Sequence, residues 1–460
     1  MGKAQSLTGD VISSLRASVR GRVIDGGAAE YDDARRVFYS GFDRRPAAIV
    51  RVLDAADISA VVRLARDARL PVAVRNGGHS PAGHSTIDGG LVLDLSAMKK
   101  LDVDPVGRTA WADAGLTAGE YTDAVGTHGL ATGFGDAGSV GISGITLSGG
   151  VGFLHRRHGL TLDNVLAADI VTASGEQLRV DAQSHPDLFW AIRGGGGNFG
   201  VVTRWQYRLH EVGTVLAGII VFPASEELIP AVLDAVAESS DALSGVIAIM
   251  PAPPMPLFPP EVHGRMIIMA NLVHCGAEDE AEREISRLRT IAKPIVDMMQ
   301  RTPYPSIYHF GEPPRPPLIA LRPTFVDAID RKDAETIIGM LQQSRARMRV
   351  AQFRVLGGAV ARVDRSATAF AYRHRTMMAI IAAAIADPAE AAEHQAWADA
   401  LAARLPSGEG GAYVGFLADD DSERVRDAYP ADTWKRLAAV KQAYDPDNIF
   451  HRTQNIPPVK

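Results

Sequence analysis

The sequence predicts an α+β protein with two domains. Its 460 residues exceed the size at which a single hydrophobic core stops growing. Hydrophobic residues make up 46% of the chain and charged residues 22%, as in ordinary soluble globular proteins. Near residue 213 the pattern changes from alternating strands and helices with many glycines to longer strands and alanine- or arginine-rich helices. We therefore expect one domain from residues 1–212 and 412–460 and a second from residues 213–411.

The first domain begins with a strand–helix–strand pattern. Apolar runs of strand length occupy residues 47–53 and 71–74. Between them, residues 58–70 place apolar side chains at helical spacing. This alternation predicts a βαβ-like start.

The rest of the first domain contains four further segments. Residues 109–129 predict a strand and an amphipathic helix, and residues 164–180 predict two strands around a turn. Residues 185–212 predict a short helix, a glycine loop and a strand. Residues 132–152 are too apolar for a solvent linker and too rich in glycine for a regular helix.

The second domain is expected to hold an antiparallel sheet with helices on one face. Its proline-rich run, residues 250–264, predicts an extended surface loop that can reach over the site. The predicted strands are residues 215–222, 245–250 and 265–275. The predicted helices are residues 278–292 and 389–405.

Charge and cysteine content exclude several classes of protein. A net charge of -6 gives no reason to expect nucleic acid or an anionic membrane as a partner. The single cysteine, Cys275, excludes an internal disulfide and a multi-cysteine metal site, and no other metal motif is found. The N-terminus lacks the apolar run of a signal peptide, and no later run is long enough to span a membrane. We therefore expect a cytoplasmic protein.

Glycine clusters suggest a nucleotide cofactor, although the usual motifs are absent. The chain lacks the G-x-G-x-x-G of nicotinamide dehydrogenases at its first strand–helix turn, and it has no P-loop, H-E-x-x-H or G-x-S-x-G. Glycine pairs let backbone N–H groups approach anionic oxygens, as in a diphosphate site. Any one pair can equally be a tight turn. The four clusters are Gly77–Gly78, Gly89–Gly90, Gly149–Gly150 and Gly194–Gly197.

Five segments, in the right order, resemble a family of flavoenzymes. The family is the berberine bridge enzyme-like branch of the p-cresol methylhydroxylase and vanillyl-alcohol oxidase superfamily. Within it, the chain looks particularly like the bacterial 6-hydroxynicotine oxidases and the flavin oxidases that tailor polyketides. The resemblance implies a two-subdomain FAD-binding domain of the p-cresol methylhydroxylase type and an antiparallel-sheet substrate domain with helices on one face. The five segments are residues 71–98, 140–154, 159–176, 185–203 and 436–458.

The resemblance also separates two similar histidines. In the family, the histidine of an R-x-G-G-H-S segment bonds covalently to the 8α-methyl of FAD, and that residue here is His79. His84 is then a neighbour of the cofactor. Many relatives attach the flavin a second time through a cysteine, and Ala137 stands at that position. Because Cys275 lies in the other expected domain, we predict a single histidyl link.

Further residues match positions that surround the flavin in the family. Ile145 corresponds to an apolar residue that governs access of oxygen to the flavin. The expected cofactor-binding residues besides His79 and His84 are Arg75, Asn76, Gly77, Gly78, Ser80, Gly83, Gly141, Gly144, Gly149, Gly150, Gly152, Asn164, Gly200, Val202 and Asn455.

The catalytic base is not evident. Plant members carry a glutamate and a tyrosine that align here with Ala379 and Phe416. Candidates for proton transfer are therefore sought in the second domain: His274, Tyr304, Tyr308 and His309, with Gln352 as a polar contact. His274 ranks first because strand alternation sets it on the opposite face from its neighbours.

The resemblance implies an FAD-linked oxidoreductase. We expect it to oxidise a small or aromatic natural-product-type substrate by hydride transfer to flavin N5, with O2 as the acceptor. The missing base keeps open a flavin-dependent oxygenase or a redox-neutral cyclase, and a non-enzymatic binding protein of the same fold is a third class. The sequence leaves the oligomeric state open, a homodimer included.

Overall fold

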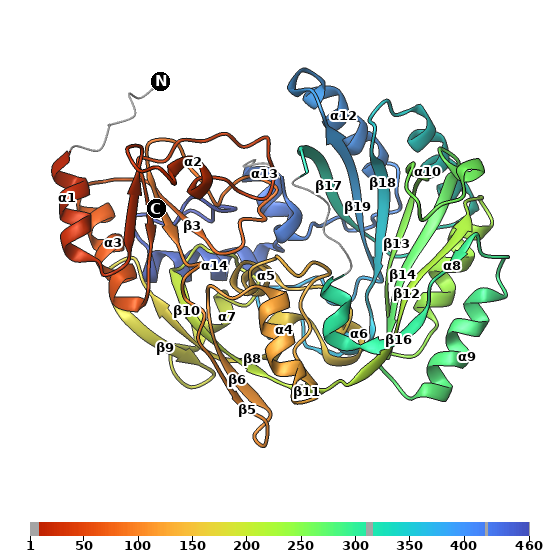
Figure 1. Ribbon diagram of the computed structural model, residues 1–460, viewed down its shortest axis with the longest axis horizontal. Coiled ribbons are helices and arrows are strands. Elements are labelled where there is room, and N and C mark those ends of the chain that lie inside the picture. The colour runs from red at the N-terminus through yellow and green to blue at the C-terminus, as the bar shows by residue number, and fades with distance from the viewer. Residues whose placement is uncertain (1–8, 310–315, 419–421, 460) are drawn as a thin grey trace.

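The structure is a computed structural model that describes residues 9–309, 316–418 and 422–459. In Figure 1 the N-terminal and C-terminal elements lie together on one side, and a large sheet with its helices lies on the other. Within the described ranges, we find no helix with the length and apolar character needed to cross a membrane. The prediction that the N-terminus carries no leader falls partly on residues 1–8, which lie outside the described residues.

The first sheet confirms the strand–helix–strand start. Its region contains α1 (Gly9–Ser18), β1 (Arg22–Asp25), α2 (Tyr31–Ala34), β2 (Ala48–Arg51), α3 (Ala55–Asp67), β3 (Val72–Arg75) and β4 (Leu91–Asp94). The strand order is β1-β2-β4-β3, in which β2 and β3 each pair with β4 in parallel. Helix α3 begins at Asp54, whose carboxylate accepts the backbone N–H groups of Ala56 and Asp57.

The second sheet is antiparallel, in the order β5-β6-β10-β8-β9, with the strands β5 (Leu101–Asp104), β6 (Thr109–Asp113), β8 (Val165–Val171), β9 (Gln177–Asp181) and β10 (Val201–Arg208). The predicted turn between β8 and β9 is confirmed, and Gly175 adopts a φ of +80° there. The surrounding elements are α4 (Ala118–Gly126), β7 (Leu130–Ala131), α5 (Ile142–Ser148), α6 (His155–His158), η1 (Thr161–Asn164), α7 (Pro186–Ala191) and β11 (His210–Glu211).

Helix α5 corrects the prediction that residues 132–152 contain no regular helix. Ile142, Ser143 and Thr146 are buried on one side of this helix. The Thr146 hydroxyl lies 2.8 Å from the hydroxyl of Tyr207. A glycine inside a helix costs about 1 kcal/mol relative to alanine, so burial of one face can outweigh it.

The third sheet is antiparallel, as expected for the sheet of residues 213–411 (Figure 1). Its strands are β12 (Thr214–Pro223), β13 (Leu243–Pro251), β14 (Met266–His274), β15 (Val296–Asp297), β16 (Gln300–Pro303), β17 (Leu318–Val326), β18 (Arg349–Val355) and β19 (Met377–Ile385). Apolar residues of four helices pack on one face of this sheet. These helices are α8 (Leu228–Ala237), α9 (Glu278–Arg289), α10 (Arg331–Gln343) and α12 (Ala391–Ala402). Short helices join them: η2 (Pro260–Val262), η3 (Tyr304–His309), α11 (Gly358–Arg362) and η4 (Pro388–Glu390).

Strand β19 shows which side chains face the helices. Met377, Ala379 and Ile381 pack in the helix-side core, whereas Met378 and Ile380 pack on the opposite face. Ala379, which aligns with the family's glutamate, therefore points toward the helices. The sequence of β19, MMAIIAAAI, contains no ionisable side chain on either face.

The C-terminal segment returns to the first half of the chain. It contains η5 (Val414–Phe416), α13 (Ser422–Asp427) and α14 (Ala431–Tyr444), and Leu437 and Ile456 pack in the same core as the second sheet. Strand β12 begins at Thr214, one residue after the expected boundary. The division into residues 1–212 with 412–460 and residues 213–411 remains a proposal.

A buried ion pair anchors this segment. Neither side chain of Lys441 and Asp445 is exposed, and the ammonium donates to the carboxylate at 2.6 Å. Lys441 also donates to the carbonyl oxygens of Asn198 at 2.8 Å and Phe450 at 3.2 Å. Asp445 accepts the backbone N–H groups of Ile449 and Phe450. The pair therefore joins α14 to the loop before β10 and to the tail.

Candidate functional site

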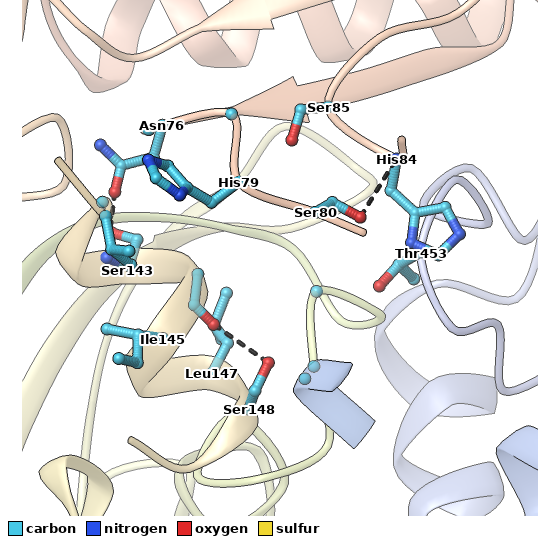
Figure 2. Close-up of a pocket in the computed structure, with 18 of the residues that line it drawn as sticks. Asn76, His79, Ser80, His84, Ser85, Ser143, Ile145, Leu147, Ser148 and Thr453 are labelled. Carbon is cyan, nitrogen blue, oxygen red and sulfur yellow. Dashed lines mark hydrogen bonds between the residues drawn. The ribbon is translucent and has the colours of Figure 1, made fainter. Parts of the chain in front are cut away.

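A cavity of about 400 Å³ lies where distant parts of the chain meet. Its walls come from the loop after β3, the segment around α5, the loop before β10, and residues 450–454. Figure 2 shows the first loop with His79 and His84, helix α5 with Ile145, and the C-terminal segment with Thr453 around one space. This volume is in the range of small-molecule and cofactor pockets, roughly 300–1,000 Å³.

Glycines let two walls of the cavity approach each other closely. A Cβ atom on Gly77 would lie 2.4 Å from the backbone nitrogen of Gly141, and one on Gly141 would lie 2.0 Å from Oδ1 of Asn76. The same Oδ1 accepts the backbone N–H of Ser143 at 3.1 Å (Figure 2). Side chains at either glycine would disrupt this junction. Both glycines also line the cavity, and backbone N–H groups on such a wall can bind anionic oxygens.

His79 is half-buried on the wall of the cavity. Its ring stacks on Phe38, with centroids 3.8 Å apart and planes inclined by 21°. Its Nε2 lies 2.7 Å from the hydroxyl oxygen of Ser139. The ring therefore has a defined orientation at the cavity surface.

His84 lies in the same loop but in a different setting. It is buried, with 7% of its surface exposed, and its backbone N–H donates to Oγ of Ser80 at 3.2 Å. Figure 2 shows its side chain near Thr453, on the side of the cavity closed by the C-terminal segment.

About half of the expected cofactor-binding residues line the cavity. The positions of Ala137, Ile145 and Phe416 line it as well. The expected residues on its wall are Asn76, Gly77, Gly78, His79, Ser80, His84, Gly141, Gly144, Gly200 and Val202. The structure does not bring Arg75, Gly83, Gly149, Gly150, Gly152, Asn164 and Asn455 to the wall.

Several of these remaining residues have packing roles. Arg75 is buried in an ion pair with Asp94 at 3.0 Å. A Cβ atom on Gly83 would lie 2.8 Å from the ring of Phe42. Asn164 donates to the carbonyl of Leu160 at 2.9 Å.

The paired glycines beside α5 make room for neighbours. A Cβ atom on Gly149 would lie 2.8 Å from the Tyr413 ring, and one on Gly152 would lie 1.2 Å from the carbonyl oxygen of Phe134. On Gly150 it would lie 1.9 Å from the hydroxyl oxygen of Thr161. These glycines therefore allow Tyr413, Thr161 and the Phe134 carbonyl to pack closely against the segment beside the cavity.

None of the five candidate catalytic residues is among the residues that line the cavity. The alternation along β14 was read correctly, but His274 faces the helices, where its Nε2 lies 3.3 Å from Glu284 of α9. Burial lowers the pKa of His274. Tyr304 is fully buried, and its hydroxyl lies 3.3 Å from that of Tyr308. His309 is exposed and pairs with Asp123.

Gln352 lies beside a charged pair that the sequence interpretation missed. Its Oε1 accepts from the Arg354 guanidinium at 3.3 Å, and the same guanidinium donates to Asp136 at 2.7 Å. Arg354 and Asp136 both line the cavity. The guanidinium carbon also lies 5.6 Å from the centroid of the Phe416 ring. The alternation of β18, which puts residues 352 and 354 on one face, was the available signal.

Two phenols complete the polar part of the wall. Burial raises the pKa of Tyr413 to about 12, and its hydroxyl accepts the backbone N–H of Gly150 at 2.9 Å. Burial, and the nearby charge of Asp136, raise the pKa of Tyr39 to about 12. Both phenols are therefore protonated near neutral pH.

The proline-rich run does not reach the cavity. Phe258 and Val262 are buried in a small cluster with Val221 and Ile267, at the end of the third sheet. The run is therefore a packed loop of the sheet, which corrects the expectation that it covers the site.

This fold, with a glycine-walled cavity closed by the C-terminal segment, defines an FAD-linked oxidoreductase. Residues 46–181 match the family model described as an FAD binding domain, and residues 412–457 match the model described as berberine and berberine like. The chain is 32% identical to (R)-6-hydroxynicotine oxidase of Paenarthrobacter nicotinovorans, over 96% of this chain and 97% of the relative. It therefore belongs to the berberine bridge enzyme-like family of FAD-linked oxidoreductases, and FAD is its cofactor.

Solved structures agree with this assignment. The 6-hydroxy-D-nicotine oxidase of Arthrobacter nicotinovorans superimposes with a TM-score of 0.84 at 28% identity, covering 96% of this chain and 99% of that one. The berberine bridge enzyme-like protein 1 of Physcomitrella patens gives a TM-score of 0.87 at 21% identity, over 98% and 99% of the two chains. The second likeness concerns the fold alone.

Proposed function

We propose that this enzyme holds FAD through one covalent bond from His79 and oxidises a small or aromatic amine-bearing natural product, with O2 as the electron acceptor. The observation that carries the proposal is the His79 imidazole, which lies on the cavity wall beside several glycines and contacts Ser139. When bound, FAD accepts a hydride at N5 and passes two electrons to O2, which yields hydrogen peroxide.

Different residues on the wall would bind different parts of the cofactor. His79 would supply the covalent link. The backbone around Gly77, Gly78 and Gly141, which lines the cavity, would receive the diphosphate. Arg354 would place positive charge in the wall near the site of oxidation.

A second link is not expected. Ala137 lines the same cavity, and its methyl group cannot form one. Cys275 is not among the residues that line the cavity, and its Sγ lies 3.4 Å from the carbonyl oxygen of Ala242. Burial raises the pKa of this thiol to about 11, which disfavours the reactive thiolate.

The pairing of the one carboxylate on the wall favours an amine as the substrate. Asp136 is the one carboxylate among the residues on the wall, and it is paired with Arg354. The phenols of Tyr39 and Tyr413 hold their protons at neutral pH. In a neutral amine, the nitrogen lone pair can form the C=N bond as hydride leaves the neighbouring carbon. No wall residue then has to remove a proton during hydride loss.

Anaerobic mixing of the purified enzyme with a substrate panel tests the proposal. We expect secondary and tertiary aromatic amines to bleach the visible flavin band, and admission of air to restore it with one peroxide per product. Matched alcohols and sugars serve as controls and should leave the band unchanged. Bleaching by alcohols alone would contradict the amine assignment, and reoxidation without peroxide would contradict the oxidase assignment.

The same mixing experiment, repeated with isotopically enriched O2, distinguishes an oxidase from a flavin-dependent oxygenase. One relative, an FAD-dependent monooxygenase of Fusarium proliferatum, is 37% identical over 42% of this chain. An oxygenase would transfer label from isotopically enriched O2 into the product, whereas the proposed oxidase would not.

A further inference from the structure

The imidazole of His79 stacks on the ring of Phe38, which fixes the plane of the imidazole. Phe38 stacks on the ring at 3.8 Å between centroids, and the backbone N–H of Phe38 donates to the carbonyl of Gly78 at 3.1 Å. Gly78 adopts a φ of +75°, which favours glycine, so this turn fixes the loop that carries His79 against Phe38.

Stacking alone does not decide which edge of the ring faces the cavity. A rotation of the imidazole by 180° about its Cβ–Cγ bond keeps the stacking on Phe38 but exchanges the position of each nitrogen with that of a carbon. A polar neighbour at the edge of the ring can distinguish the two orientations. Ser139 is such a neighbour, because its hydroxyl oxygen lies 2.7 Å from Nε2.

Ser139 reaches this place because of the close glycine junction. A Cβ atom on Gly77 would lie 2.8 Å from the carbonyl oxygen of Ser139, so a larger residue would push the two segments apart. The segment that carries Ser139 and the loop that carries His79 are thus in direct backbone contact.

The hydroxyl also influences the state of the ring. When Nε2 carries the proton and donates it to Oγ of Ser139, the lone pair is on Nδ1, which is then the nucleophilic nitrogen. Attachment would break one C–H bond of the flavin 8α-methyl, whose proton would leave to solvent, and would form the bond between Nδ1 and that carbon. The flavin would take up the two electrons released and pass them to O2. The attached ring would be cationic, because Nε2 keeps its proton. A hydrogen bond from a charged ring to the hydroxyl is stronger than one from a neutral ring, so Ser139 favours the bonded state.

We propose that Ser139 is a positioning residue for cofactor attachment: its hydroxyl selects the ring orientation and tautomer of His79 that can bond to FAD. The inference rests on the proposed covalent role of His79. Ser139 contacts the histidine and acts through it.

The test compares how fast the flavin becomes covalent in Ser139→Ala, Ser139→Thr and the unchanged enzyme. Samples taken at intervals after induction are purified with their FAD, and flavin retained after acid precipitation is divided by total flavin. Loss of the hydroxyl removes the hydrogen bond at Nε2 that favours one ring orientation and one tautomer. We expect Ser139→Ala to slow attachment about tenfold, as for the loss of one hydrogen bond to a charged group. Ser139→Thr keeps the hydroxyl and should restore most of the rate.

The outcomes are separable. Equal rates in Ser139→Ala and the unchanged enzyme would overturn the inference. So would a parallel loss of total bound FAD or of thermal stability in Ser139→Ala, because that pattern marks a merely structural role. If acid releases all flavin from the unchanged enzyme, the covalent role of His79 itself fails, whichever residue stands at position 139.

Discussion

Replacement of His79 by alanine is expected to leave no flavin attached to the protein after acid precipitation, whereas the unchanged enzyme retains it. The ring of His79 lies on the cavity wall, stacks on Phe38 and contacts the hydroxyl of Ser139. Without a covalent bond, FAD is held only by the remaining contacts of the cavity. A denaturing gel viewed under ultraviolet light shows the difference directly, as a fluorescent band that His79→Ala lacks.

His84→Ala is the matched control because it removes a second imidazole from the same loop and the same cavity. It is expected to keep the fluorescent band, although it should weaken packing near Thr453. A fluorescent band in His79→Ala would show that another residue carries the link. Loss of the band in both variants would show that the loop as a whole, rather than the imidazole of His79, governs attachment.

Replacement of Lys441 by methionine is expected to lower the free energy of unfolding by about 3–5 kcal/mol. The ammonium is the buried partner of Asp445, and removing it leaves a carboxylate without a counter-charge in the core. It also removes the hydrogen bonds to the carbonyl oxygens of Asn198 and Phe450. Urea titration followed by tryptophan fluorescence measures the change.

Two variants control for other effects. Lys435→Met changes an exposed lysine on the same helix and should alter stability by less than about 0.5 kcal/mol. Lys441→Met combined with Asp445→Leu removes both charges and should recover part of the loss, because no buried charge is then left alone. If the single variant is as stable as Lys435→Met, the ion pair does not anchor the tail.

The regular parts of the fold were predictable because periodicity reflects burial. The strands and helix of residues 47–74, the two strands around Gly175 and the antiparallel third sheet all follow from apolar spacing. Helix α5 was missed because local propensity argues against it, and the contacts that stabilise it come from residues such as Tyr207, distant in the chain. Sequence patterns cannot weigh such contacts.

The site was predictable where the cofactor wall is a continuous stretch of chain. Most of the loop from Asn76 to His84, though not Gly83, lies on the cavity, as do Gly141 and Gly144. Gly149 and Gly152 do not, because a glycine that accommodates a neighbouring side chain or carbonyl looks the same in a sequence as one that faces a ligand. The pair of Asp136 and Arg354 joins residues 218 positions apart, which no local pattern connects.

The walls of the cavity have a consequence for how the enzyme is made. Residues 450–454 close the cavity, and they follow every other segment of the wall in the order of synthesis. A nascent chain therefore presents His79 to solvent long before the pocket around it exists. Cofactor loading has to be a late event, after release of this segment from the ribosome, and a chain interrupted before Phe450 would accumulate without its cofactor.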